Sequence, residues 1–342
     1  MAQYDLRMRA FQIQGKLDGK VLEIPTPEPG QDEVRLKISY VGICGSDLHY
    51  YFEGANGAFV VKEPLIPGHE ISGTIDLDPS GTYKSGTKVT IHPATFGNCE
   101  PGLEESPHLW PGGGYLGSAS TWPHTQGAMS EYFIVKKEKV RILPDSLDLE
   151  VAALAEPLGV ALHAINIASG VKDKEILVSG SGPIGMMVIA AAKVLGAKSI
   201  TATDILITAL ERATNLGANK VINVSENQIP ANSFDLVFEC SAAAPAVTSA
   251  LNAVKRAGTV VQLGMMGAQA QNIGVAPLVA KEITWKGSFR FNYEVDQAIE
   301  MLAAHPWIGK AISHTLDLNN AIEAFEVAKD SAKSGKVLVK VN

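Results

Sequence analysis

A glycine-rich segment at residues 180–185 constrains the fold of this chain more than any other feature. It reads Gly-Ser-Gly-Pro-Ile-Gly, follows the apolar run 176–178, and opens an apolar stretch of helical length that Gly196 ends. In this context Gly180 permits a tight turn, Gly182 lets the main chain approach a pyrophosphate, and Gly185 allows close packing of helix on strand. The proline fits the first helical turn, where no N–H is needed, and the helix N-terminus offers donors to phosphate oxygens. The segment therefore predicts a dinucleotide-binding unit contacted by Gly180, Gly182, Pro183, Ile184 and Gly185.

An acidic residue beyond this segment indicates which dinucleotide is bound. Asp204 lies 204 − 185 = 19 residues after the last glycine, at the end of the next strand-like run, 199–203. A carboxylate there accepts hydrogen bonds from ribose hydroxyls and repels a 2′-phosphate. No Arg or Lys lies between Asp204 and Glu211, so we expect NAD; the alternative is that Asp204 only caps the following helix. Further contacts to the dinucleotide are expected from Ser241, Gly264 and Ser288.

The pattern of strands and helices changes near residue 150. Before it, short strand-like runs (34–38, 70–75, 88–91, 131–135) are separated by Pro and Gly, and the segment 93–127 is long and aperiodic. After it, strand-like and helix-like runs alternate (176–178, 184–195, 199–203, 208–216, 221–224, 234–238, 246–256, 259–263), which is typical of a parallel sheet. The end of the chain is mixed, with helices expected at 295–304 and 321–328 and a closing strand at 336–341.

Composition excludes several classes of protein. The 342 residues are 46% hydrophobic and 19% charged, with a formal net charge of −7, which excludes intrinsic disorder and argues against a nucleic-acid or anionic-membrane partner. Three cysteines are too few for a disulfide framework, and the N-terminus shows no basic segment followed by an apolar one. The apolar stretch 176–197 is interrupted by four glycines, a proline and Lys193. We therefore expect a cytoplasmic protein with a small-molecule partner.

Thiol, imidazole and carboxylate side chains occur at spacings that suggest a metal site. Cys44 is followed after 69 − 44 = 25 residues by His69 and Glu70, and Glu156 comes much later. Such donors suit catalytic zinc, which keeps one position open for water or substrate. Adjacent residues cannot both face one side of a regular strand, so we expect His69 to bind directly and Glu70 to need a local bend or a supporting role. Taken singly, Cys44 and His69 would be ordinary core residues.

Together these motifs resemble the zinc-dependent medium-chain dehydrogenases in order and spacing, essentially from end to end. Residues 44–51 (Cys-Gly-Ser-Asp-Leu-His-Tyr-Tyr) and 287–291 (Gly-Ser-Phe-Arg-Phe) are similar to the polyol branch, which includes sorbitol and L-idonate 5-dehydrogenases. The resemblance implies an α/β fold: a doubly wound Rossmann sheet, residues 155–285, inserted in a mainly β, GroES-like catalytic domain, 1–154 plus 286–342. It also implies a homo-oligomer, a dimer or tetramer.

The resemblance assigns roles to individual residues. It implies that Cys44, His69 and Glu156, the last directly or through water, hold one catalytic zinc with Glu70 beside it. Which glutamate binds directly stays open. Asp47 would orient the ring of His69. A proton relay through Ser46 and His49 is implied, the alternative being that both are ordinary polar loop residues, and Arg290 is expected to bind a substrate hydroxyl or carboxylate.

The aperiodic segment departs from the family pattern. Members often carry a structural zinc held by four closely spaced cysteines, whereas residues 96–102 keep only Cys99. We therefore expect no structural zinc, a lobe held by proline, glycine and aromatic packing, an unpaired thiol at Cys99, and a core position for Cys240.

The expected reaction is hydride transfer between NAD and a secondary alcohol of a sugar acid, as in an L-idonate 5-dehydrogenase giving the 5-keto acid. A sorbitol or other polyol dehydrogenase is the next interpretation, and a general secondary-alcohol dehydrogenase the third. A zinc-free quinone reductase on the same fold, and a non-enzymatic NAD-binding protein, are the alternatives from other classes.

Overall fold

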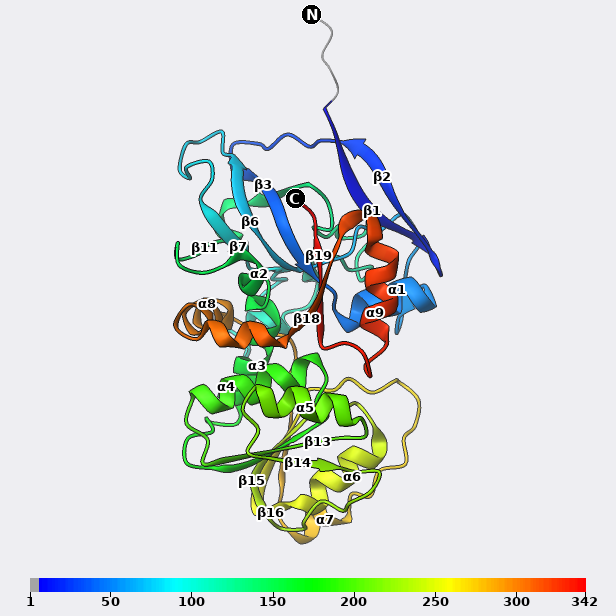
Figure 1. Ribbon diagram of the computed structural model, residues 1–342, viewed down its shortest axis with the longest axis vertical. Coiled ribbons are helices and arrows are strands. Elements are labelled where there is room, and N and C mark those ends of the chain that lie inside the picture. The colour runs from blue at the N-terminus through cyan, green and yellow to red at the C-terminus, as the bar shows by residue number, and fades with distance from the viewer. Residues whose placement is uncertain (1–5) are drawn as a thin grey trace, which may run out of the picture. The chain divides into compact units, whose positions relative to one another are not determined.

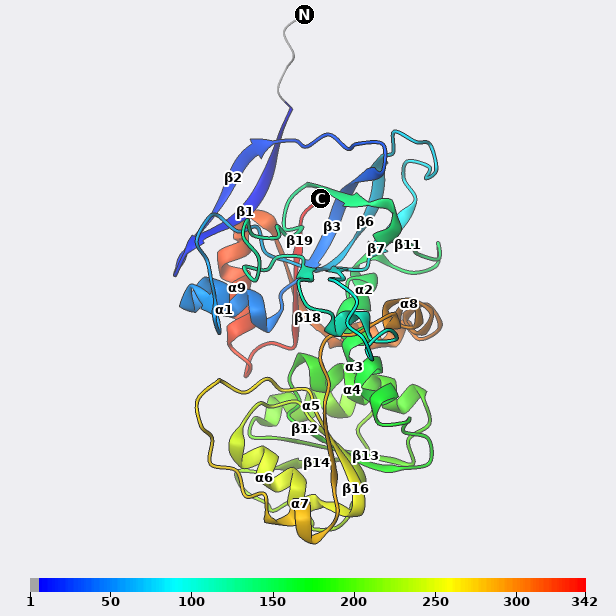
Figure 2. The same cartoon turned by 180° about the vertical axis from the view of Figure 1, so that it is seen from behind.

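The computed structural model describes residues 6–342, which form two compact units (Figures 1 and 2). The first contains the residues up to Glu156 together with Ala298–Asp330 and Lys336–Asn342. The second contains Pro157–Gln297 and the short stretch Ser331–Gly335. Residues 1–5, which the expectation about a secretory leader concerns, lie outside the described part.

A seven-stranded sheet organises the first unit. Its strands follow the order β11-β7-β6-β3-β19-β18, and β10 pairs with β3 outside that path. Because β19 runs antiparallel beside β3, with Leu338 opposite Gly42, the end of the chain lies next to the strand that leads to Cys44. The strands are β3 (Glu33–Gly42), β6 (Glu70–Leu77), β7 (Lys88–Ile91), β10 (Tyr132–Lys136), β11 (Val140–Ile142), β18 (Ile312–Asp317) and β19 (Lys336–Lys340).

Smaller elements complete this unit. The two-stranded pairs are β1 (Arg7–Gly15) with β2 (Asp18–Pro25), β4 (Ala55–Asn56) with β5 (Phe59–Val60), and β8 (Ala94–Thr95) with β9 (Gly114–Tyr115). The helices are α1 (Gly45–Glu53), α2 (Leu149–Ala152) and α9 (Ala321–Lys329), with single 3₁₀ turns η1 (Pro107–Leu109), η2 (Lys137–Lys139), η3 (Pro306–Ala311) and η4 (Leu318–Asn320).

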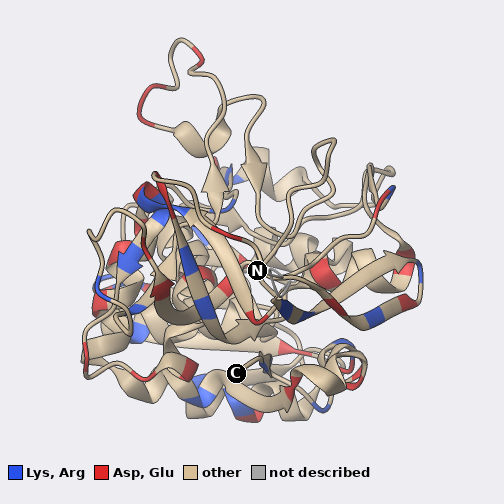
Figure 3. Cartoon of the chain, turned by 90° about the horizontal axis from the view of Figure 1, so that it is seen from above, with Lys and Arg blue, Asp and Glu red and all other residues tan. Residues whose placement is uncertain are grey.

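Alternation of side chains along β3 shows how the sheet forms its core. Val34, Leu36 and Ile38 are fully buried, whereas Arg35 and Lys37 between them are not, as expected for a strand with one face on a core. Arg35 pairs with Asp76 of the neighbouring strand β6 at 2.6 Å. Basic and acidic residues are interspersed in the view of Figure 3 rather than separated by sign.

The second unit is a doubly wound parallel sheet, as the sequence predicts. Its six strands follow the order β14-β13-β12-β15-β16-β17. Strands β12, β13 and β14 are thus added toward one edge of the sheet, and β15, β16 and β17 toward the other. The strands are β12 (Glu175–Ser179), β13 (Ser199–Asp204), β14 (Lys220–Asn223), β15 (Phe234–Glu239), β16 (Val254–Gln262) and β17 (Thr284–Gly287). The helices are α4 (Pro183–Val194), α5 (Ile207–Asn215), α6 (Ala244–Ala253) and α7 (Ala276–Ala280); the chain passes between the units within α3 (Ala155–Ile167) and α8 (Glu294–Ala304).

One predicted helix is wrong at its end. The apolar pattern of 246–256 predicts a helix, but α6 ends at Ala253 and strand β16 begins at Val254. Val254 has extended backbone, with a φ of −68° and a ψ of 144°, which an α-helix cannot contain, and its β-branched side chain favours the strand.

The aperiodic segment, 93–127, has little regular structure beyond β8, β9 and the turn η1. Aromatic and main-chain contacts hold it: the ring of Phe96 lies 6.5 Å from that of Trp110, and Trp110 Nε1 donates to the Leu103 carbonyl at 2.7 Å. A Cβ at Gly97 would collide with the Pro111 carbonyl, so the segment folds back closely on itself.

The apolar stretch 176–197 is divided between β12 and α4. None of the helices in residues 6–342 combines the length and apolarity that a membrane crossing requires.

Candidate functional site

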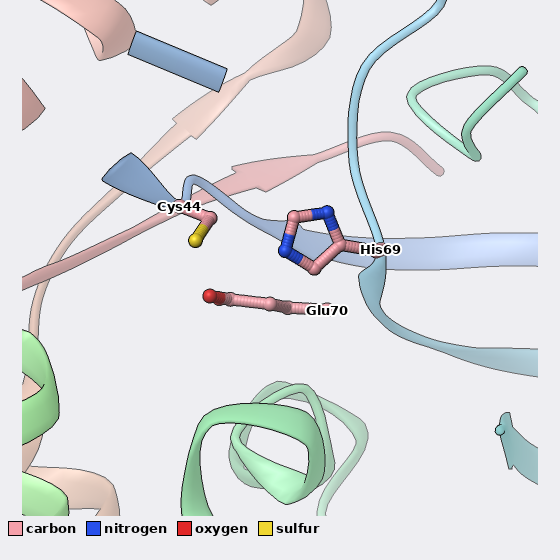
Figure 4. Close-up of side chains that lie close together, drawn as sticks. All are labelled: Cys44, His69 and Glu70. Atoms are coloured by element: carbon pink, nitrogen blue, oxygen red, sulfur yellow. The ribbon is translucent and has the colours of Figure 1, made fainter. Parts of the chain in front are cut away.

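Three side chains, one from Cys44 and two from the adjacent residues His69 and Glu70, meet at the ends of two paired strands. Cys44 follows β3, while His69 and Glu70 stand at the start of β6. The strands are antiparallel, with Gly42 opposite Glu70, so the end of one meets the beginning of the other. One donor atom each from Cys44, His69 and Glu70 lies within 4.8 Å of the others (Figure 4). We call these three residues the donor cluster.

A bend before β6 lets adjacent residues face the same point. The strand begins only at Glu70, so the alternation of a regular strand does not apply to His69. Gly68 has a φ of 98°, a conformation that favours glycine. A Cβ at Gly42 would overlap the carboxylate of Glu70, so this second glycine makes room for it. The structure thus contains the local bend that is needed for Glu70 to face the same point as His69.

The donor cluster is buried among charged side chains. His69, Glu70, Asp47 and Glu156 are all buried, and Lys336 Nζ donates to Glu70 Oε1 at 2.5 Å and to the Ile43 carbonyl at 2.9 Å. Buried charges are normally paired or bound to metal ions. Three carboxylates and a thiol face one lysine and one histidine here, so the surroundings favour a cation.

The pKa shifts point the same way. Burial alone would lower the pKa of His69, but the Cys44 thiol and the charges of Asp47 and Glu156 raise it to about 10. The pKa of Lys336 is also raised, because Glu70, Cys44 and Glu156 outweigh burial. Burial raises the pKa of Glu156. The group of side chains therefore stabilises positive charge at the donor cluster.

Asp47 links two main-chain segments, the one at Cys44 and the one just before His69. Its Oδ2 accepts from Cys44 N at 2.9 Å and its Oδ1 from Gly68 N at 3.3 Å, which fixes the start of α1 against the bend before His69. Orientation of the His69 ring by Asp47 remains a prediction, because these two hydrogen bonds are made to main-chain groups.

Glu156 lies next to the donor cluster but is not one of its three members. Its Oε1 accepts from Tyr115 Oη at 2.5 Å, and the Tyr115 ring stands edge-on to the ring of His69 at 5.3 Å. The sequence reasoning missed both Tyr115 and Lys336. Tyr115 sits in the aperiodic segment, and Lys336 is 266 residues from Glu70, so no local pattern connects either residue with the site.

The donors fit a zinc ion. Thiolate, imidazole and carboxylate are zinc ligands, and His69 Nδ1 is buried without a hydrogen-bond partner among the described residues. An unsatisfied buried nitrogen and a surplus of buried negative charge are both relieved by a divalent cation.

The glycine-rich segment has the geometry that its sequence predicts. Gly180 follows β12 with a φ of 91°, and a Cβ there would press on Ser241. A Cβ at Gly185 would collide with the Gly180 carbonyl, whereas a Cβ at Gly182 would meet no atom within 4 Å. The main chain at Gly182 is thus open to a ligand, and α4 begins at Pro183.

Asp204 is the last residue of β13 and is held from both sides. Its Oδ2 accepts from Ser181 N at 2.8 Å and its Oδ1 from Leu206 N at 3.0 Å. Arg212, one residue beyond the stretch searched for basic residues, donates to the Ser331 carbonyl at 2.6 Å. The carboxylate is therefore fixed between the glycine-rich segment and α5.

The remaining residues expected to bind the dinucleotide follow neighbouring parallel strands. Ser241 comes just after β15, Gly264 after β16 and Ser288 after β17. Glu239, which the sequence reasoning missed, accepts from Ser241 N at 2.9 Å and from Gln262 Nε2 at 2.5 Å. Because carboxyl ends of parallel strands share one edge, these residues and Gly180 lie along what we call the dinucleotide edge.

Comparison with known proteins shows the family of this chain. Residues 30–145 match the alcohol dehydrogenase GroES-like domain, and residues 183–304 match the zinc-binding dehydrogenases. The chain is 33% identical to L-idonate 5-dehydrogenase (NAD(P)(+)) of Escherichia coli (strain K12) over 315 residues, 88% of this chain and 90% of that protein. It is 34% identical to sorbitol dehydrogenase of Bacillus subtilis (strain 168) over 308 residues, 87% of this chain and 86% of that protein.

This chain belongs to the zinc-type alcohol and polyol dehydrogenase family. The crystal structure of L-idonate 5-dehydrogenase from Escherichia coli matches it with a TM-score of 0.92 at 30% identity, covering 98% of each chain. That of 2R,3R-butanediol dehydrogenase from Bacillus subtilis matches with a TM-score of 0.86 at 27% identity, covering 98% of this chain and all of the other. The expected GroES-like and Rossmann-type architecture is thereby confirmed.

Within this dehydrogenase, Ser46 and His49 lie in a helix rather than in a loop. Both belong to α1, which starts directly after Cys44. The side chain of His49 is 52% exposed, and its Nδ1 lies 3.1 Å from Glu53 Oε1. Ser46 is half-buried in the first turn, so the pair leads from the neighbourhood of Cys44 to solvent.

Arg290 of the dehydrogenase lies in the second unit, after β17. Its φ is 52°, unusual for a residue with a side chain, and its guanidinium stands 4.7 Å from the centre of the Phe289 ring. The same loop is anchored by Glu294, whose carboxylate accepts from Asn292 N at 2.8 Å and lies 2.8 Å from His163 Nδ1.

Proposed function

We propose that this dehydrogenase uses one zinc ion and NAD to transfer hydride from the secondary alcohol of a sugar acid, with L-idonate the first candidate. Sorbitol or another polyol is the second candidate, and a simple secondary alcohol the third. The observation that carries the proposal is the donor cluster, in which half-buried Cys44 meets buried His69 and Glu70, in a chain that also has the dinucleotide edge. Likeness to an L-idonate and a sorbitol dehydrogenase supports the order of substrates.

Cys44, His69 and Glu70 would hold the metal, with Glu156 beside it. Zinc bound there supplies Lewis-acid activation, which lowers the pKa of a substrate hydroxyl. Lys336 holds the Glu70 carboxylate in place, and Asp47 holds the main chain next to Cys44 and His69. These contacts keep the donors fixed before substrate arrives, which is how a protein stabilises charge without reorganising.

The substrate proton would leave through α1. In this proposal the Ser46 hydroxyl takes up the proton as it releases its own, which passes by way of the nicotinamide ribose to His49, exposed to solvent beside Glu53. A positioned acid–base relay of this kind contributes about 10²–10⁴-fold to turnover.

NAD is the proposed cofactor. The main chain at Gly182 is open to a pyrophosphate, and Asp204 presents a carboxylate where the ribose hydroxyls bind. The next basic residue after Asp204, Arg212, already donates to the Ser331 carbonyl, and Thr208 Oγ1 donates to the Ala332 carbonyl at 2.7 Å. A 2′-phosphate would therefore be repelled by the Asp204 carboxylate, while Arg212 is already engaged with Ser331.

Arg290 would bind the carboxylate of a sugar acid, because a guanidinium forms two parallel hydrogen bonds with a planar carboxylate. One zinc per chain is proposed, because residues 96–102 keep only Cys99. We also propose a homo-oligomer, a dimer or tetramer, because the chain resembles the medium-chain dehydrogenases.

The deciding experiment measures metal content by atomic emission together with NAD reduction over a panel of sugar acids, polyols and alcohols. About one zinc per chain and fastest turnover of L-idonate are expected. Fastest turnover of sorbitol would select the second substrate class. Activity without metal would indicate a zinc-free reductase, and metal without activity on any alcohol would favour a non-enzymatic NAD-binding protein; either result overturns the proposal.

A further inference from the structure

A tyrosine from the aperiodic segment makes two contacts at the donor cluster. Tyr115 Oη donates to Glu156 Oε1 at 2.5 Å, and its ring stands edge-on to His69 at 5.3 Å. Only 5% of Tyr115 is exposed. Strand β9 fixes its main chain, because Tyr115 pairs with Ala94 and the next residue, Leu116, donates to the Pro93 carbonyl at 3.3 Å. The hydroxyl is thus presented from a fixed position.

Glu156 needs a restraint of this kind. It stands in the first turn of α3, is buried, and its charge acts on His69, yet it is not among the three donors that converge. A free carboxylate so close to a zinc site would be drawn to the ion as a further ligand. A hydrogen bond from a phenol to a carboxylate is charge-assisted and therefore strong enough to compete.

We propose that Tyr115 is a positioning residue that keeps Glu156 out of the direct zinc ligands and so keeps one coordination position open for substrate. The inference rests on the proposed zinc site and adds which glutamate binds there and why. It also gives the aperiodic segment a function: this segment lacks the cysteines of a structural zinc lobe, but supplies the residue that restrains Glu156.

The variant Tyr115→Phe tests the inference because it keeps the ring beside His69 and removes only the hydroxyl. Glu156 then loses its partner while remaining a buried carboxylate, and binding to the metal becomes its best alternative. We expect zinc to leave more slowly to a chelator, because Glu156 then adds a fourth protein ligand to the ion. We also expect the cobalt-substituted variant to show an altered visible spectrum and kcat to fall more than KM rises.

Two further variants separate this effect from general loosening. In Tyr115→Phe combined with Glu156→Gln, the neutral amide is a poor zinc ligand, so the cobalt spectrum and the zinc loss rate should return to those of wild type. Tyr50→Phe is the matched control: Tyr50 is equally buried and its Oη lies 3.1 Å from Ser118 Oγ of the aperiodic segment, so it loosens the segment without freeing Glu156. Its cobalt spectrum should not change.

The outcomes distinguish the inference from the function on which it rests. If the wild type binds one metal through a thiolate, but Tyr115→Phe leaves the cobalt spectrum and the zinc loss rate unchanged, only the role of Tyr115 is overturned. Changes that persist in the double variant would assign them to lost packing and also overturn it. A wild-type protein that binds neither zinc nor cobalt would overturn the proposed zinc site itself.

Discussion

The donor cluster and the dinucleotide edge are held in place by different kinds of interaction. The donor cluster consists of a half-buried thiol, a buried imidazole and a buried carboxylate. Its geometry depends on Lys336, which donates to Glu70, and on Asp47, which accepts from the main chain of Cys44. The dinucleotide edge consists largely of main-chain groups and glycines, where an added Cβ collides with a neighbouring carbonyl, as at Gly185, or meets no protein atom, as at Gly182. The first region should therefore fail when charge is removed, and the second when volume is added.

The largest expected effect removes the buried cation of the first region. In Lys336→Met, the Glu70 carboxylate stays buried without its partner, and breaking a buried ion pair costs about 3–5 kcal/mol. Urea unfolding of the metal-free protein measures this loss. Lys340→Met, on the same strand but exposed, is the control and should change stability by less than about 0.5 kcal/mol. Equal effects of the two substitutions would contradict the account of the donor cluster.

The next largest effect is on turnover, with the stability of the fold unchanged. Ser46→Ala should lower kcat about 100-fold, because the proposed proton relay loses its first member, while zinc content stays at the wild-type value. Ser46→Thr keeps a hydroxyl and should recover most of the rate. A rate unchanged by the alanine substitution would exclude Ser46 from the relay.

The second region should respond to a single methyl group in two different ways. Gly185→Ala places a Cβ against the Gly180 carbonyl and should cost about 1–3 kcal/mol of stability. Gly182→Ala meets no protein atom, so it should leave stability unchanged within about 0.5 kcal/mol and weaken NADH binding at least about tenfold. Urea unfolding and NADH fluorescence titration test the pair; the same loss of stability in both variants would mean that the two glycines do not differ as described.

The smallest effect is a dependence on pH within the loop that carries Arg290. Burial alone would raise the pKa of Glu294, but hydrogen bonds from His163, Asn292 and Asn166 lower it to about 2. A carboxylate with a lowered pKa stabilises the fold above the unfolded value of 4.5, and this contribution is lost as pH falls toward 2. Wild type should thus exceed Glu294→Gln in Tm at pH 5, by about 2–4 °C for each 1 kcal/mol, and the difference should shrink toward pH 2. A difference that is the same at both pH values would contradict the shift.

Much of the fold follows from periodic patterns along the chain. The alternating runs after residue 150 predict the parallel sheet, and most of its strands and helices lie where their apolar runs place them. The helix expected over 246–256 fails at its end because Val254 is extended and pairs with Phe234 in the sheet, which cannot be read from apolar spacing. Helix α1 is not predicted either, because one position of its buried face is the charged residue Asp47 and it begins with Gly45.

The site is predicted unevenly for the same reason. Glycine spacing indicates the glycine-rich segment because strand, turn and helix are consecutive, and each glycine there acts on its immediate neighbours. The donor residues can be nominated by type and by family resemblance, but the bend at Gly68 that lets His69 and Glu70 act together is not visible in their spacing.

The sequence by itself therefore determined the dinucleotide-binding unit and the types of metal donor, because these depend on local chain geometry and on side-chain chemistry. Only the tertiary structure decided which side chains accompany the donors. The strand order β6-β3-β19 brings Lys336 to Glu70, and the hairpin of β8 and β9 presents Tyr115 to Glu156. Contacts between segments hundreds of residues apart follow from strand pairing and packing, which leave no periodic signal in the chain.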